Sequence, residues 1–99
     1  MAILNRETLI YDDVNGSIEL FTNNSTSITL TTYGAGSCEF EVTTDNGESW
    51  HSRFMVNMGN ANVSSTLSGE GQFYMTIADV DAIRVSNVIG FTKVIASMG

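Results

Sequence analysis

The chain has 99 residues and a mass of 10.7 kDa, the size of one domain. A hydrophobic fraction of 42% with 15% charged residues excludes a disordered acidic protein, and no run approaches the roughly 18 apolar residues of a membrane-spanning helix. The net charge of −7, with only four basic residues, opposes contact with phosphate backbones, so we expect no nucleic-acid partner and no membrane insertion.

Alternation of polar and apolar residues predicts β-strands along nearly the whole chain. The expected strands, in chain order, cover residues 8–11, 17–21, 27–31, 38–44, 50–56, 63–67, 73–77, 82–86 and 91–98. Three apolar residues between Ile77 and Val85 fall three apart, but Asp79 and Asp81 favour strand, turn and strand over a helix there. The rhythm of about 8 to 12 residues between strand centres predicts an all-β antiparallel sandwich, jelly-roll or immunoglobulin-like, with about eight or nine short strands and little or no helix.

The clearest turn signal is Asn46-Gly47, which predicts a two-residue hairpin with positive φ at both positions. The strand after it is expected to present Trp50, Phe54 and Val56 on one face, with the two aromatic residues in the core. A tryptophan left exposed would instead favour a sugar-binding platform. The predicted core consists of Ile28, Leu30, Cys38, Phe40, Val42, Trp50, Phe54, Phe73, Met75, Ile77, Ile83 and Val85.

No pattern of residues indicates catalysis or metal binding. Cys38 alternates in phase with apolar neighbours, so we expect a buried thiol, and it lacks the partner that a disulfide needs. One cysteine and His51 cannot supply the three or four ligands of a zinc site. Glu39 and Glu41 point outward from one strand and are expected to stay solvated. We therefore expect no catalytic residue, no metal and no cofactor.

The N-terminal segment, residues 1–7, lacks a basic start followed by an apolar run, so it does not indicate a signal peptide. It is either an arm or the first strand of the sandwich, and residues 8–99 form the single β-sandwich domain. As an arm it would contact a partner, with Ile3, Leu4 and Arg6 as the candidate contact residues.

Two stretches carry a resemblance to a known family. Residues 36–50, with the sequence GSCEFEVTTDNGESW, combine an alternating strand, an Asp-Asn-Gly turn and a following tryptophan. Residues 72–85, QFYMTIADVDAIRV, place a turn before an apolar-Arg-Val triplet, and a last strand follows Gly90. Together they resemble the small β-sandwich domains of tailed-phage virion proteins.

The resemblance implies a structural virion protein without enzymatic activity, made in the host cytoplasm. It favours a capsid decoration, or cement, protein that binds the major capsid protein on the outside of the assembled head and stabilises the head. A homotrimer would match a local three-fold axis of the shell. Two alternatives stay open at this point: a tail or neck accessory protein, and a carbohydrate- or receptor-binding module.

Overall fold

The computed structural model describes residues 16–99 and the backbone of residues 7–12. It confirms the all-β antiparallel sandwich, and the described residues contain no helix. The described part of the chain forms eleven strands: β1 (Glu7–Asp12), β2 (Gly16–Phe21), β3 (Ser27–Tyr33), β4 (Ser37–Thr43), β5 (His51–Ser52), β6 (Met55–Asn57), β7 (Val63–Ser64), β8 (Thr66–Ser68), β9 (Gly71–Thr76), β10 (Ala82–Ile89) and β11 (Lys93–Met98).

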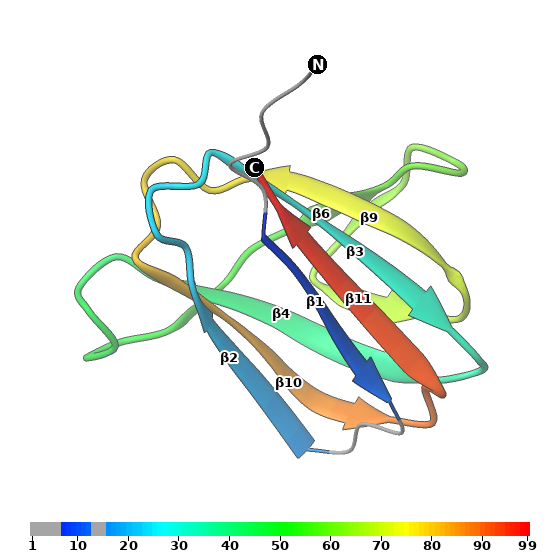
Figure 1. The fold of residues 1–99 in the computed structure, drawn as a ribbon. Coiled ribbons are helices and arrows are strands. Elements are labelled where there is room, and N and C mark those ends of the chain that lie inside the picture. The colour runs from blue at the N-terminus through cyan, green and yellow to red at the C-terminus, as the bar shows by residue number, and fades with distance from the viewer. Residues whose placement is uncertain (1–6, 13–15) are drawn as a thin grey trace.

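The strands form two sheets, which Figure 1 shows as two layers. The six-stranded sheet has the order β1-β11-β3-β9-β6-β7, and the five-stranded sheet has the order β2-β10-β4-β5 with β8 also paired to β4. Every strand pair that the structure describes is antiparallel. β5 and β8 pair with opposite ends of β4, so together they form one interrupted edge of the five-stranded sheet.

Two of the expected strands are each divided between the sheets, which raises the expected eight or nine strands to eleven. The segment 50–56 pairs with β4 through β5 and then crosses to pair with β9 through β6. The segment 63–68 crosses back, with β7 in the six-stranded sheet and β8 in the five-stranded one. The alternation changes phase in the second segment, where Val63 is exposed and Leu67 is buried, but it continues through the first, where Phe54 and Val56 are both exposed.

The core fills the space between the two sheets. All the predicted core residues are buried except Trp50, which is half-buried, and Phe54, which is 64% exposed. Those two predictions were wrong because the opposite side of this segment faces the core: Ser52 lies opposite Glu41 on the outer face, and Met55, which is 0% exposed, takes the core position. The stretch from Ile77 to Val85 is a strand end, a turn and a strand, as predicted, with the Val80 amide donating to the Ile77 carbonyl.

The Asn46-Gly47 turn has the predicted backbone conformation, with φ of 61° at Asn46 and 91° at Gly47. The two-residue connection was wrong, because strand pairing resumes only where His51 lies opposite Val42. Residues 44–50 therefore form a longer loop, the β4–β5 loop.

Candidate functional site

The outer face of the five-stranded sheet carries a row of charged side chains. Glu19 on β2 and Glu41 on β4 lie opposite Arg84 on β10, one on each side. Arg84 Nε is 3.1 Å from Glu41 Oε1, and the Ser86 hydroxyl donates to the same oxygen at 2.8 Å. The hydrogen bond from Arg84, and to a smaller extent the one from Ser86, lowers the pKa of Glu41. Glu41 is thus half-buried and ion-paired rather than freely solvated as expected, while Glu39 is exposed.

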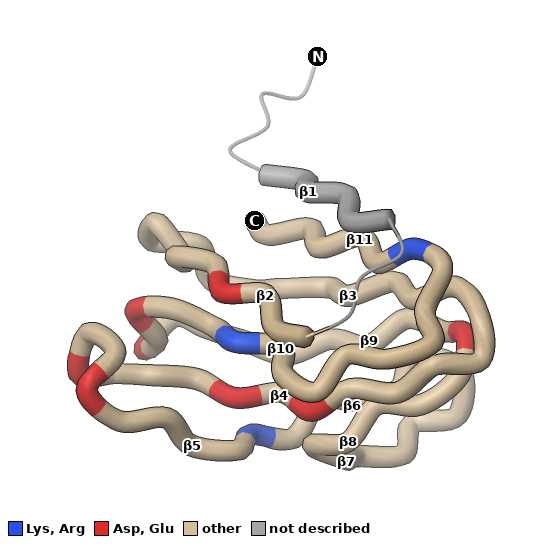
Figure 2. The backbone as a smooth tube through the Cα atoms, turned by 90° about the horizontal axis from the view of Figure 1, so that it is seen from below, with Lys and Arg blue, Asp and Glu red and all other residues tan. Residues whose placement is uncertain are grey.

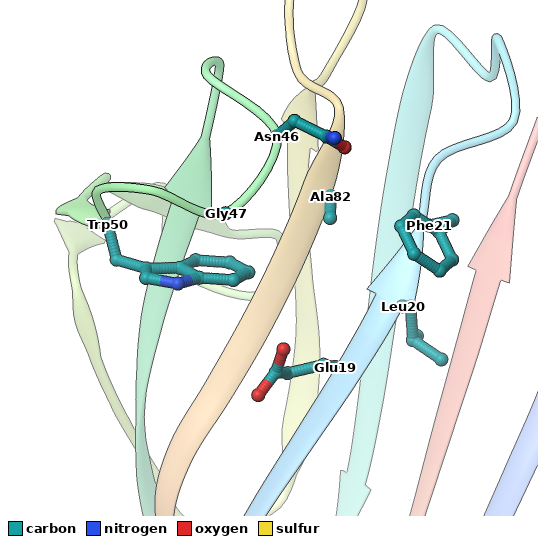
Figure 3. Close-up of a pocket in the computed structure, with 7 residues that line it drawn as sticks. All are labelled: Glu19, Leu20, Phe21, Asn46, Gly47, Trp50 and Ala82. Carbon is teal, nitrogen blue, oxygen red and sulfur yellow. The ribbon is translucent and has the colours of Figure 1, made fainter.

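A hollow of about 160 Å³ opens beside this row. The next row across the sheet is Phe21, Ala82 and Thr43, and the alanine methyl is much smaller than the side chains around it. Trp50 bounds the hollow on one side of Ala82 and Phe21 on the other, while Glu19 and Asn46 lie at its two ends (Figure 3). The hollow exists because a small residue lies between two aromatic ones.

Trp50 is positioned by Arg84. The guanidinium carbon lies 4.4 Å from the centroid of the indole ring, within the range of a cation–π interaction. Because Glu41 holds Arg84 through a hydrogen-bonded ion pair, the indole rests on a side chain that is itself fixed to the sheet. The sequence predicted this tryptophan in the core; the structure places it on the outside of the sheet, as one wall of the hollow.

The β4–β5 loop that carries Trp50 is closed by Asp45 and Thr43. The Asp45 carboxylate accepts hydrogen bonds from the Thr43 hydroxyl at 2.7 Å, from the Ser49 amide at 2.9 Å and from the Ser49 hydroxyl. Thr43 Oγ1 accepts from the Gly47 amide at 2.9 Å. The Asn46 amide donates to Asp81 at 2.9 Å, which joins the loop to the start of β10. The hydrogen bonds from Ser49, and then the one from Thr43, stabilise the charged carboxylate and lower the pKa of Asp45 to about 2.

We expect Asp45→Asn to flatten the loss of stability in acid. A carboxyl group whose pKa is about 2 in the folded protein and 3.8 unfolded stabilises the fold above about pH 4, and this contribution is lost as the pH falls toward 2. Thermal unfolding followed by circular dichroism from pH 7 to pH 2 measures the effect. In Asp45→Asn the melting temperature should start lower at pH 7 and fall less between pH 4 and pH 2.

Glu48→Gln is the matched control for this prediction. Glu48 lies in the same loop, and its carboxylate makes no hydrogen bond with another residue of the described chain. The control should keep the acid profile of the parent protein. Identical profiles for Asp45→Asn and the parent would show that the Asp45 carboxylate does not hold the loop.

Among the side chains that the structure describes, the outer face of the six-stranded sheet carries fewer charged residues than that of the five-stranded sheet. Across β3, β6, β7, β9 and β11 the only charged residue is Lys93. In Figure 2 the tubes of β3 and β9 are tan throughout, whereas β4 and β10 carry charged residues. At the β7 side Val63, Val56 and Tyr74 lie side by side across three strands, and they are 56%, 38% and 37% exposed. Together with Phe54 they form an apolar patch, which we name the β6–β7 patch.

The structure describes only some of the remaining candidate residues. The predicted partner-contact residues Ile3, Leu4 and Arg6 lie outside the described residues. Cys38 is buried as predicted, and burial, with a contribution from Glu39, raises its pKa to about 12. Within residues 16–99 no group of three acidic, histidine or cysteine side chains is arranged to hold a metal ion. The described residues include no helix long and apolar enough to cross a membrane.

Comparison with known proteins identifies the fold. No protein-family model and no curated protein matches the sequence significantly. YomS, a protein derived from the SPBc2 prophage, aligns with a TM-score of 0.72 at 14% identity over 99% of this chain and 97% of its own. The PBSX exported protein XepA aligns with a TM-score of 0.76 at 14% identity, but this chain covers only 39% of it. PirA, at 6% identity and a TM-score of 0.51, aligns over 97% of its length. Identities this low establish the shared sandwich fold alone.

Proposed function

We propose that this chain is a non-enzymatic structural protein of a phage particle, acting as a capsid decoration protein. The observation that carries the proposal is the likeness to YomS over nearly the whole length of both chains, because YomS is named as a prophage-derived protein. XepA, with the same sandwich in part of its length, is named from the prophage PBSX. The strand and turn motifs of residues 36–50 and 72–85 support the same assignment.

The outer face of the six-stranded sheet is the surface we propose for contact with the major capsid protein. The buried centres of protein interfaces are depleted in charged residues and enriched in aromatic ones, as the β6–β7 patch is. Copies of a chain with a net charge of −7 repel one another, and contact through this face adds little to that repulsion because Lys93 is the only charged residue of β3, β6, β7, β9 and β11. We also propose a homotrimer centred on a local three-fold axis of the shell, because a three-fold symmetric trimer can make the same contact with each of the three capsid subunits around that axis.

Co-sedimentation tests the proposal. Capsid shells that lack this protein are prepared from the phage that encodes it and are mixed with the purified protein. The shells are then sedimented, and the amount of this protein in the pellet is measured. We expect binding at micromolar concentration, with hundreds of copies per particle, because many weak contacts repeated over a lattice give avidity. A ring of roughly a dozen copies or fewer would instead place the protein at the neck or tail. Absence from both shells and complete particles would overturn the structural role.

Two substitutions test the proposed face. Val56→Asp puts a charge into the β6–β7 patch at a position that is 38% exposed, so the fold should tolerate it. We expect shell occupancy to fall by at least roughly tenfold, because burying an unpaired charge at an interface is unfavourable. His51→Asp puts the same charge on the exposed β5 of the other sheet and should leave occupancy unchanged. The reverse result would assign the contact to the five-stranded sheet.

A further inference from the structure

The hollow beside Trp50 has the composition of a small ligand site. Its floor is Ala82, its walls are the rings of Trp50 and Phe21, and its ends carry a carboxylate from Glu19 and a carboxamide from Asn46. Phe21 is 68% exposed, which is unusual for a large aromatic residue on an otherwise charged and polar sheet face. An apolar concavity with a few polar groups at its rim is the usual form of a ligand pocket.

The polar groups at the rim are available to a ligand. The carboxylate of Glu19 and the side-chain amide of Asn46 make no hydrogen bond with any other residue that the structure describes. Arg84 lies opposite Glu19, but its Nε pairs with Glu41 on the other side. Glu19 therefore presents acceptor oxygens, while Asn46 presents both a donor and an acceptor. Figure 3 shows the two side chains at opposite ends of the hollow.

Charge narrows the class of ligand. The carboxylates of Glu19 and Glu41 with the single cation Arg84 leave this face negative, in a chain with a net charge of −7, so an anionic ligand is disfavoured. A cationic ligand is disfavoured at the indole, because the Arg84 guanidinium already lies 4.4 Å from the ring centroid. A neutral ligand with an apolar face and a rim of hydroxyl groups satisfies both conditions.

We propose that this hollow binds one neutral hexose unit of a glycan. The C–H face of the sugar packs against the aromatic walls over Ala82, and its hydroxyl groups donate to Glu19 and exchange hydrogen bonds with Asn46. The site lies on the five-stranded sheet, whereas the proposed shell contact lies on the six-stranded sheet, so both can be occupied in one molecule. The proposal stands apart from the decoration role, because it rests on different residues and is tested without any particle.

Trp50 is the only tryptophan of the chain, so its emission reports directly on the hollow. The purified protein is titrated with neutral oligosaccharides of the glucose, galactose, mannose and N-acetylglucosamine series, and binding is confirmed by saturation-transfer NMR on the sugar. We expect at least one series to shift the emission saturably, with a dissociation constant of order 1 mM for a single bound ring. The absence of any saturable response up to about 20 mM in all four series would overturn the proposal.

Variants separate the hollow from the rest of the surface. Ala82→Leu fills the floor and keeps both aromatic rings, so affinity should fall by at least roughly tenfold. Phe21→Ala, at an exposed position that the fold tolerates, should weaken binding similarly and serves if Ala82→Leu does not fold. Phe54→Ala on the other sheet is the control and should bind as the parent does. Unchanged affinity in both hollow variants, or a response to choline in place of sugars, would overturn the assignment.

Discussion

Replacing Gly36 with alanine is expected to destabilise the domain by more than about 3 kcal/mol, a large part of the 5 to 15 kcal/mol that holds such a domain together. A Cβ atom at Gly36 would lie 2.4 Å from the Ile89 carbonyl oxygen and 2.5 Å from the Phe91 amide nitrogen. The first atom belongs to the last residue of β10 and the second to the turn that follows, and the carbonyl carbon of Gly90 between them would lie 2.7 Å away. All three are backbone atoms, so relief of the clash requires the end of β10 and the turn to move together. Urea unfolding at neutral pH measures the loss.

Gly71→Ala is the matched control for the Gly36 variant. A Cβ atom at Gly71 would lie 3.6 Å from its nearest neighbour, the aromatic Cζ atom of Phe73, which is an ordinary contact. We expect this change to alter stability by less than about 1 kcal/mol. If the Gly36→Ala protein is insoluble while the Gly71→Ala protein is soluble, that result also supports a large loss of stability at Gly36. Equal stability of the two variants would show that the turns at Gly36 and Gly90 do not meet closely.

Phe40→Ala is expected to cost about 3 to 5 kcal/mol, because it leaves a large cavity in the core. Phe40 is 0% exposed and lies on β4 opposite Val85 of β10. Its backbone also joins the two divided strands: its amide donates to the Ser65 carbonyl, and its carbonyl accepts from the Arg53 amide. Thermal unfolding should show a drop of more than about 12 °C in the melting temperature, since each kcal/mol is worth roughly 4 to 8 °C in a domain of this size.

Phe54→Ala removes the same side chain from the surface and provides the comparison. Phe54 is 64% exposed, so its loss should change stability by less than about 0.5 kcal/mol. The contrast tests which side of the segment 50–56 faces the core, because the opposite orientation would bury Phe54 as deeply as Phe40. Similar losses of stability in the two variants would contradict the placement of Phe54 on the outer face and of Met55 in the core.

The alternation of residues was sufficient to predict the sandwich and most of its core. Within β3, β4 and β9, and in β10 as far as Val85, the side chains facing inward are those that a period of two selects. A bulge after Val85 then shifts the register of β10 and buries Val88. The buried Cys38 followed from the same reasoning. The positive φ at Asn46 and Gly47 was also predictable, since these two residue types tolerate the left-handed region.

The candidate site could not be predicted in the same way. The sequence predicted a hairpin at Asn46-Gly47, but the loop is longer because the Thr43 and Asp45 side chains bond its amides. That longer loop carries Trp50 onto the outer face, where it rests against Arg84. The hollow further depends on Ala82 lying beside Phe21 in the register of β2 and β10. No local pattern marks any of these three conditions.

The sequence by itself thus determined the fold class, the inward face of β3, β4 and β9, and the acidic, cysteine-poor character of the chain. The tertiary structure alone decided where strands change sheets, that Gly36 and Gly90 meet, and which side chains share the outer face. The physical reason is the distance along the chain over which each effect acts. Alternation and turn preference act between neighbours in the chain, whereas strand crossing, register and the contact of distant turns depend on packing that brings remote residues together.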